Sequence, residues 1–498
     1  MAAPAKPHLV FFPFPAQGHV TPAFQLATLL HQCHGFDVTF VHTEHNRRRL
    51  LHARGPDALA GSPGFRFAAV PDGLPASDED AAQDMAALHM SLSTVVPHLK
   101  KLVLSQLLLS PTASCCIISD VDHILRAAEN IGLPCVTFWT ASASSFMAFQ
   151  QFQQLVAKGL VPLKDAEQLR NGYLSSTVID WVPGLPTSMR LIDFPSFIRT
   201  TDPDDAVLAL VLRSMECHRT VPSAVIFHTL EEMERQVMSA LSAILPPAYA
   251  IGPLPLLLSG AGGGGDPAIH VSGSSTSLSK ENRACLEWID GKRHNSVLFA
   301  SFGSLAKLAH EQLVELAWGL ANSGYEFLWV IRSDQQGLVD GGAVLPPEFL
   351  AETEGRGCVT SWCPQEAVLR HDAVGAFLTH CGWNSMLQSV CAGVPMLCWP
   401  VAADQQTNSR LACTEWRVGV ELGENASREE VETAIRQVMG GERGEELRRS
   451  AMEWKEKAAL AARPGGSSWA NLEKVANEVL APLIAAHRKE CDDAMELS

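Results

Sequence analysis

The segment Trp362–Gln405, WCPQEAVLRHDAVGAFLTHCGWNSMLQSVCAGVPMLCWPVAADQ, has the clearest pattern of strands and helices in the chain. Its apolar run Gly375–Thr379 predicts a buried strand, and Met396–Trp399 predicts a second one. Between them, the polar turn His380–Ser385 leads into a helix. A strand, a helix and a second strand in this order form a βαβ unit, which predicts a parallel sheet.

The rest of the chain repeats this rhythm of strands and helices in two halves. Further strands are expected at His8–Phe14, Asp37–Val41, Cys115–Ser119, Cys135–Trp139, Val297–Ser301, Phe327–Ile331 and Cys358–Ser361, with helices at Glu311–Ala321 and Glu366–Arg370. Thr21 and Pro22 predict the start of the first helix, with threonine as its N-cap. The pattern predicts an α/β fold of two doubly wound domains that face one another across a ligand-binding cleft.

A glycine- and serine-rich stretch separates the two halves. Its run Gly260–Gly265 lacks the Lys-Ser/Thr of a phosphate-binding P-loop, so we interpret it as part of a flexible linker. We expect a first domain over residues 1–253, the linker over 254–284 and a second domain over 285–468. The last segment, 469–498, should form a helix that packs back across the first domain and then a tail.

The bulk composition sets limits on function. The chain has 498 residues, of which 47% are hydrophobic and 18% charged, as in a globular protein with more than one core. A net charge of −16 argues against nucleic acid or an anionic membrane surface as partner. No apolar run is long enough to predict a membrane span. Thirteen cysteines without a CxxC pair indicate reduced thiols in a cytoplasmic protein, which we expect to be a monomer.

The turn after Thr379 has the properties of an anion site. Backbone N–H groups at a helix N-terminus are unpaired and carry partial positive charge, so they favour a diphosphate. His380, Asn384 and Ser385 can add side-chain donors there. A second strand-end turn, Phe302-Gly303-Ser304, follows another predicted strand.

These motifs together resemble the signature of plant family 1 UDP-dependent glycosyltransferases. That family has the GT-B fold, in which two Rossmann-like domains with parallel sheets face an interdomain cleft. The resemblance implies a UDP-sugar donor and a small-molecule acceptor, with no metal ion or other cofactor. Asp180–Asp205 resembles a subgroup that acts on cyanohydrins, terpenoid alcohols and cytokinins. We therefore expect an inverting O-glucosyltransferase with UDP-glucose as its donor. Its acceptor would be a hydroxyl of a small lipophilic plant metabolite, namely a terpenoid alcohol, a cyanohydrin, a cytokinin or a phenolic.

The resemblance also implies roles for individual residues of the donor site. Trp362 would stack on uracil, backbone groups of Cys363 would read the uracil edge and Gln365 would contact the ribose. The phosphates would be held by Ser304 and by the turn that contains His380, Gly382, Asn384 and Ser385. Asp404 and Gln405 would bind the glucose hydroxyls, and Gln405 together with Trp383 is typical of UDP-glucose users.

Gln388 departs from the family pattern, which has glutamate at this place for the ribose 2′- and 3′-hydroxyls. A carboxylate accepts both hydrogen bonds, whereas an amide has one acceptor oxygen and an NH₂ donor. Bonds to a charged group are also stronger. The sequence therefore predicts a weakened hold on the ribose.

A catalytic pair is implied near the N-terminus. His19 lies in the family's N-terminal motif, here FPFPAQGHV from Phe12, as the general base, and an ordinary imidazole with a pKa of about 6.5 can accept a proton at cellular pH. Asp120 ends a predicted strand and matches the aspartate that orients this histidine. Asp122 is the alternative partner, because the segment after Asp120 is shorter than is common in the family. Thr140 matches a threonine near the sugar.

Two other classes of function are compatible with parts of the sequence. A nicotinamide-dependent oxidoreductase would share the strand–helix rhythm, but the first turn lacks GxGxxG. A non-catalytic UDP-sugar-binding protein would explain Gln388, but His19 and Asp120 argue against it.

Overall fold

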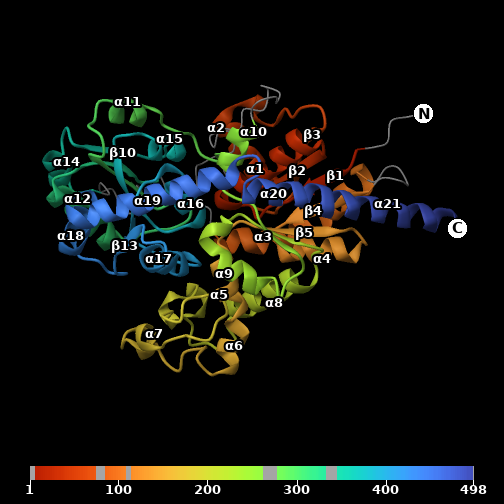
Figure 1. The fold of residues 1–498 in the computed structure, drawn as a ribbon, viewed down its shortest axis with the longest axis horizontal. Coiled ribbons are helices and arrows are strands. Elements are labelled where there is room, and N and C mark those ends of the chain that lie inside the picture. Colours follow the sequence, from red (N-terminus) through yellow and green to blue (C-terminus); the bar gives the residue numbers. More distant parts are fainter. Residues whose placement is uncertain (1–5, 75–84, 108–113, 262–276, 333–344, 497–498) are drawn as a thin grey trace.

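The computed structural model describes residues 6–74, 85–107, 114–261, 277–332 and 345–496. Within these residues the chain forms two sheets of parallel strands, one in each half of the sequence (Figure 1). The strand order is β3-β2-β1-β4-β5-β6-β7 in the first sheet and β10-β9-β8-β11-β12-β13 in the second. The order reverses between β1 and β4 and between β8 and β11, as in doubly wound sheets. The predicted α/β fold class is therefore confirmed.

The strands are short and mostly buried. The first sheet contains β1 (His8–Phe11), β2 (Asp37–Thr43), β3 (Phe65–Val70), β4 (Cys115–Ser119), β5 (Cys135–Trp139), β6 (Val225–Phe227) and β7 (Ala248–Ala250). The second contains β8 (Val297–Ser301), β9 (Glu326–Val330), β10 (Gly357–Thr360), β11 (Val374–Thr379), β12 (Met396–Cys398) and β13 (Gly419–Glu421). The sequence pattern does not predict β3, β6, β7 or β13, and the last three have only three residues each, too few for a period to stand out.

Helices lie between the strands in both halves. In the first half they are α1 (Gln17–His34), α2 (Glu44–Arg54), α3 (Met85–Leu102), α4 (Asp122–Asn130), α5 (Ala143–Gln150), α6 (Phe152–Ala157), α7 (Tyr173–Ser176), α8 (Ala206–Thr220), α9 (Glu231–Leu241) and α10 (Leu254–Ala261). In the second they are α11 (Ala284–Asp290), α12 (His310–Ser323), α14 (Pro347–Glu352), α15 (Gln365–Leu369), α16 (Trp383–Ala392), α17 (Gln405–Thr414) and α18 (Arg428–Met439).

The first helix starts earlier than predicted. It begins at Gln17 rather than at Thr21, with extended Ala16 as its N-cap. The carbonyl of Ala16 accepts the N–H groups of His19 and Val20 at 2.9 and 3.0 Å, which forms the first turn without a side-chain cap. The prediction of Thr21 as N-cap is therefore wrong, and His19 belongs to the helix itself.

The expected linker begins with a helix. Residues Leu254–Ala261 form α10, and Leu254 and Leu257 are fully buried in the core of the first sheet. A helix places both leucines on one face and buries them, which stabilises the fold, whereas a solvated loop would leave them exposed to water. The prediction of a loop from 254 is wrong to this extent, and most of the glycine run, from 262 onward, lies outside the described residues.

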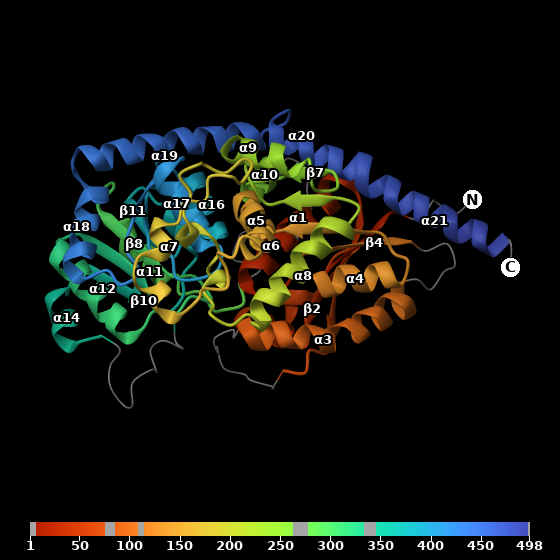
Figure 2. The same ribbon diagram turned by 90° about the horizontal axis from the view of Figure 1, so that it is seen from below.

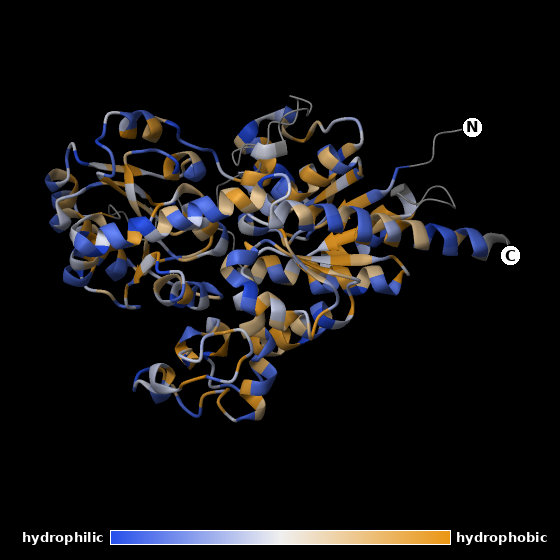
Figure 3. Ribbon diagram, viewed as in Figure 1, coloured by the Kyte–Doolittle hydropathy of each residue, from blue (hydrophilic) through white to orange (hydrophobic). Residues whose placement is uncertain are grey.

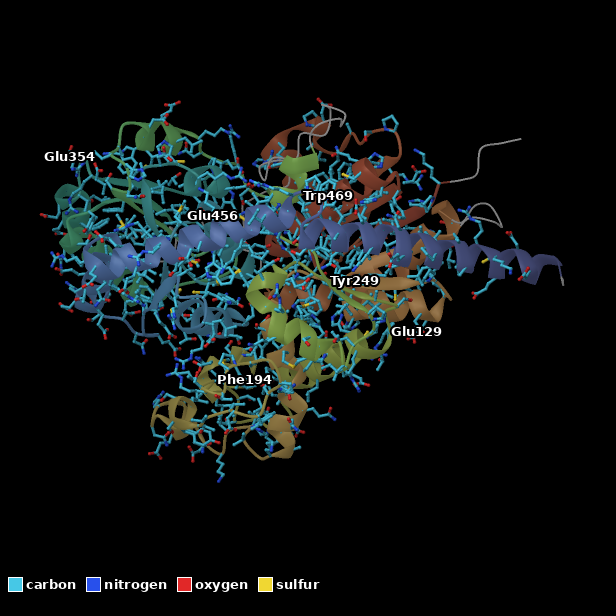
Figure 4. The ribbon with its side chains drawn as sticks, in the orientation of Figure 1. Glu129, Phe194, Tyr249, Glu354, Glu456 and Trp469 are labelled. Atoms are coloured by element: carbon cyan, nitrogen blue, oxygen red, sulfur yellow. The ribbon has the colours of Figure 1, made fainter. Side chains whose placement is uncertain are left out.

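The C-terminal helices run along the whole molecule. The segments α19 (Gly441–Ala462), α20 (Ser467–Lys474), a π-helical stretch (Val475–Leu480) and α21 (Ala481–Glu496) follow one another across both sheets (Figure 2). Figure 4 marks this passage, with Glu456 of α19 over the second half and Trp469 of α20 over the first. Leu472, Val475 and Leu480 are fully buried against the core of the first sheet, which ties the chain end to the N-terminal half.

Apolar side chains fill the interior of both halves. The strands are the most hydrophobic elements, and hydrophilic residues gather on the outer helices (Figure 3). One apolar cluster extends from α5 and Phe194 across to Phe299 and Met396 of the second sheet, so part of the core is shared by the two halves. The two halves therefore pack directly against each other through apolar side chains.

Candidate active site

Two strand-end turns, one from each sheet, meet in the structure. His19 and Asp120 lie at the β1/β4 reversal, and Ser304 and His380 follow the neighbouring strands β8 and β11. Ligands of doubly wound sheets bind outside the carboxyl ends of the strands at such reversals. The structure therefore brings two ligand-binding edges together.

His19 is held by two side chains of the first sheet. Its Nδ1 lies 2.5 Å from Asp120 Oδ2 and 2.9 Å from Thr140 Oγ1. The other carboxylate oxygen of Asp120 accepts the N–H of Phe14 at 2.7 Å. The Asp120 side chain is 3% exposed and that of His19 34% exposed. Because Nδ1 is engaged with the buried carboxylate, Nε2 is the nitrogen left to accept a proton.

Asp122, the alternative partner, has a different contact. It is the first residue of α4, and its Oδ1 lies 2.9 Å from His123 Nδ1. The short segment after Asp120 thus turns directly into α4 and leaves Asp120 at the strand end. The contacts in the described chain pair His19 with Asp120, which supports the first of the two assignments.

The ring of His380 packs closely against two glycines, Gly303 and Gly382, at the β8/β11 reversal. A Cβ on Gly303 would lie 2.6 Å from the His380 ring, and one on Gly382 would lie 2.4 Å from it. Burial, and then the nearby Arg332 guanidinium, lower the pKa of His380 to about 4. The ring is therefore neutral near pH 7, so it can donate one N–H to an anion without carrying a charge.

Asn384 links the two turns directly. Its Nδ2 donates to the carbonyl of Gly18 at 2.6 Å. That carbonyl is available because Pro22, four residues later in α1, has no N–H to complete the helical bond. A proline inside the helix thereby creates an acceptor for the opposite half, directly beside His19.

The aromatic and amide residues of the signature segment form a second group. Trp362 Nε1 donates to Ser277 Oγ at 3.0 Å, which fixes one edge of the indole. Gln365 Nε2 donates to Ser385 Oγ at 3.0 Å and to Gln388 Oε1 at 2.8 Å. Gln388, the departure from the family pattern, therefore uses its acceptor oxygen within the protein. Cys363 lies buried next to Trp362.

The end of the segment forms the start of α17. Gln405 Oε1 accepts the N–H groups of Val401 and Ala402, both at 2.9 Å, so its NH₂ group is the part left for a ligand. Asp404 Oδ2 accepts from Asn408 at 2.8 Å, and burial raises the pKa of Asp404. Trp383 is buried, and its Nε1 donates to the carbonyl of His228 at 2.7 Å, so it supports the turn from below.

Sequence reasoning missed three polar residues at this site. Arg332 follows β9 and donates to the carbonyls of Gly303 and Ala306 at 2.9 and 2.8 Å. Ser142 and Asn408 hydrogen-bond to each other across the two halves. The sequence could have indicated Arg332, since this residue comes directly after a predicted strand. It could not have indicated the Ser142–Asn408 contact, which joins positions far apart in the chain.

The described residues contain neither a cluster suited to a metal ion nor a helix suited to a membrane. No three or more His, Cys, Asp or Glu side chains there are grouped so that they could hold a metal ion. Of the helices in the same ranges, none combines the length and the apolar character that a membrane crossing requires.

Two facing doubly wound domains, with a histidine–aspartate pair opposite a helix N-terminus, have the arrangement of the GT-B fold. Residues 218–453 match the family model described as "UDP-glucoronosyl and UDP-glucosyl transferase". The 7-deoxyloganetin glucosyltransferase of Gardenia jasminoides is 49% identical, over 96% of this chain and 99% of that protein. The (R)-mandelonitrile beta-glucosyltransferase of Prunus dulcis is 46% identical, over 96% and 98%.

Solved structures agree with these relatives. Os79 from O. sativa in complex with UDP has a TM-score of 0.76 at 27% identity, over 95% of this chain and 100% of that one. Medicago truncatula UGT71G1 complexed with UDP-glucose has a TM-score of 0.74 at 25% identity, over 95% and 98%. The chain belongs to the family of UDP-dependent glycosyltransferases and is an enzyme of the hexosyltransferase class. This membership decides against the nicotinamide-dependent alternative.

Proposed function

We propose that this protein is an inverting O-glucosyltransferase that moves glucose from UDP-glucose to a hydroxyl group of a small lipophilic molecule. The observation that carries this proposal is the pairing of His19 with buried Asp120 at a turn that is itself bonded to Asn384 of the opposite half. A base and an anion-binding helix N-terminus thereby lie side by side.

The mechanism follows from this arrangement. His19 Nε2 takes the proton of the acceptor hydroxyl while its oxygen attacks the anomeric carbon of glucose from the face opposite the UDP group. The bond from that carbon to the phosphate oxygen breaks, so the configuration inverts and UDP leaves with the electron pair. The buried Asp120 carboxylate stabilises the imidazolium that forms. The N-terminus of α16 and neutral His380 hold the departing diphosphate.

The remaining donor contacts are assigned by matching positions to the family signature. Trp362 presents its ring to uracil, backbone groups of Cys363 read the base edge, and Gln365 and Gln388 face the ribose. Ser304, Gly382, Asn384 and Ser385 surround the diphosphate. Thr140, Asp404 and Gln405 contact the glucose, and Trp383 supports the turn.

The acceptor is proposed from relatives and from the surroundings of His19. Two relatives are named for 7-deoxyloganetin and for (R)-mandelonitrile, a terpenoid and a cyanohydrin. The ring of Phe14 lies 5.2 Å from that of His19, which places an apolar side chain beside the proposed base and supports an apolar acceptor. We place the enzyme in the cytoplasm, because all thirteen cysteines are free thiols, which suits a reducing compartment. A monomer is the proposed state.

The test is a transfer assay. The purified protein is incubated with UDP-glucose, EDTA and a panel of terpenoid alcohols, cyanohydrins and phenols, while UDP release and new glucoside masses are followed. We expect UDP and a β-glucoside in equal amounts with EDTA present. Binding of UDP-glucose without any product on a broad panel would favour the non-catalytic alternative, and no binding at all would overturn the proposal.

Gln388→Glu should bind UDP about tenfold more tightly than the parent, a gain of about 1–2 kcal/mol. The added carboxylate can accept from Gln365 and still accept from both ribose hydroxyls, and its charge strengthens each bond. Calorimetric titration with UDP measures the change. Gln437→Glu, the same substitution at an exposed place on α18, is the control and should bind as the parent does. Equal affinities for parent and Gln388→Glu would show that the ribose contact lies elsewhere.

A further inference from the structure

One buried amide on α17 joins three parts of the site. Asn408 is fully buried and lies one helical turn after Asp404. Its Nδ2 donates to Asp404 Oδ2 at 2.8 Å and to the carbonyl of Cys381 at 3.1 Å. Its Oδ1 accepts the hydroxyl of Ser142 at 2.7 Å. Both N–H groups and the oxygen of this amide are therefore used.

Each of the three partners belongs to a different part of the site. Asp404 is the carboxylate assigned to the glucose. Cys381 has a left-handed backbone (φ 65°) in the turn that faces the diphosphate. Ser142 caps α5 in the other half, where it also accepts the N–H of Ser145, and it lies two residues after Thr140. Asn408 thus connects the Asp404 carboxylate with Ser142, in the half of the molecule that carries His19.

The residue type follows from these contacts. A side chain of this length must supply two donors and one acceptor, and only an amide does so. An aspartate would place a second carboxylate against Asp404. An apolar residue would leave the Ser142 hydroxyl, the Cys381 carbonyl and Asp404 without this partner in a buried place, which is costly for each group.

We propose that Asn408 is a positioning residue that orients the Asp404 carboxylate toward the glucose of the bound donor. This proposal rests on the proposed function, because that function assigns Asp404 to the sugar. It goes further by naming the residue that sets the carboxylate in place and by coupling that placement to Ser142 of the opposite half. Asn408 itself touches neither the sugar nor the diphosphate in this role.

The test compares two ligands that differ only in the glucose. Wild type and Asn408→Ala are titrated calorimetrically with UDP-glucose and with UDP, without acceptor. We expect Asn408→Ala to lose about tenfold in affinity for UDP-glucose relative to wild type, the value of one hydrogen bond to a charged group. UDP should bind nearly as before, because the turn keeps the bond from the Cys381 N–H to Thr379 Oγ1.

Thr407→Val is the matched control. Thr407 is the neighbouring residue on α17, is fully buried and also bonds across the two halves, with Oγ1 donating to the carbonyl of Asp193 at 2.7 Å. Its bond does not involve Asp404, so both ligands should bind as in wild type. Asn408→Ser leaves a smaller void and should show the same selective loss if Asn408→Ala folds poorly.

The outcomes separate the alternatives. Equal losses for UDP and UDP-glucose would overturn the positioning role, because the amide would then support the fold or the domain contact alone. Unchanged UDP-glucose affinity in both Asn408 variants would overturn it as well. Failure of the wild-type protein to bind UDP-glucose would instead be a failure of the proposed function, and this inference would fall with it.

Discussion

His19→Ala should lower kcat for glucosyl transfer by about 10²- to 10⁴-fold, the usual contribution of a general base. The reason is geometric, because Asp120 and Thr140 hold Nδ1 and leave Nε2 for the acceptor proton. The affinity for UDP should stay near that of the parent, since the proposed role of His19 is toward the acceptor and not toward the uridine. Initial rates with an acceptor found in the panel, together with a UDP titration, measure the two effects separately.

His123→Ala is a close control for this experiment. His123 also pairs with an aspartate and is exposed to a similar degree, 38% against 34% for His19. Its partner is Asp122, away from His19, so the rate should remain near that of the parent. If His19→Ala kept most of the parent rate, proton transfer would have to be assigned to another group.

Asp120→Asn should reduce kcat by a similar factor while the protein keeps its fold. The amide has the same shape, so it can still accept the N–H of Phe14, but it replaces the charge that stabilises the His19 imidazolium. If its NH₂ faces Nδ1, it also favours the wrong tautomer. The measurement is kcat at saturating UDP-glucose, with thermal unfolding recorded to confirm that the variant is folded.

Asp122→Asn is the natural comparison, because the sequence leaves both aspartates open as partners. Asp122 contacts His123, and its substitution should leave the rate close to that of the parent. A large loss in Asp122→Asn without one in Asp120→Asn would reverse the assignment and would mean that the site rearranges when substrates bind.

Much of the fold can be predicted from local patterns. The apolar runs of β4, β5, β8 and β11 predict those strands well, because strands buried on both faces are continuously apolar. Three-residue strands such as β6 lack enough residues to show a pattern. The sequence predicts the start of α1 too late, because Thr21 and Pro22 have the residue types of a helix start, whereas the helix follows the extended backbone at Ala16.

The class of the protein can be predicted from the sequence alone, since Trp362–Gln405 carries two strands of the second sheet, the turn into α16 and most of the residues proposed to bind the donor. Three contacts are visible only in the folded molecule: His19 with Asp120, Asn384 with the carbonyl that Pro22 leaves without its helical partner, and Ser142 with Asn408. The physical reason is that a local pattern records which backbone conformation a segment prefers. A hydrogen bond between residues more than a hundred positions apart depends on how strands and sheets pack, and no single segment records that.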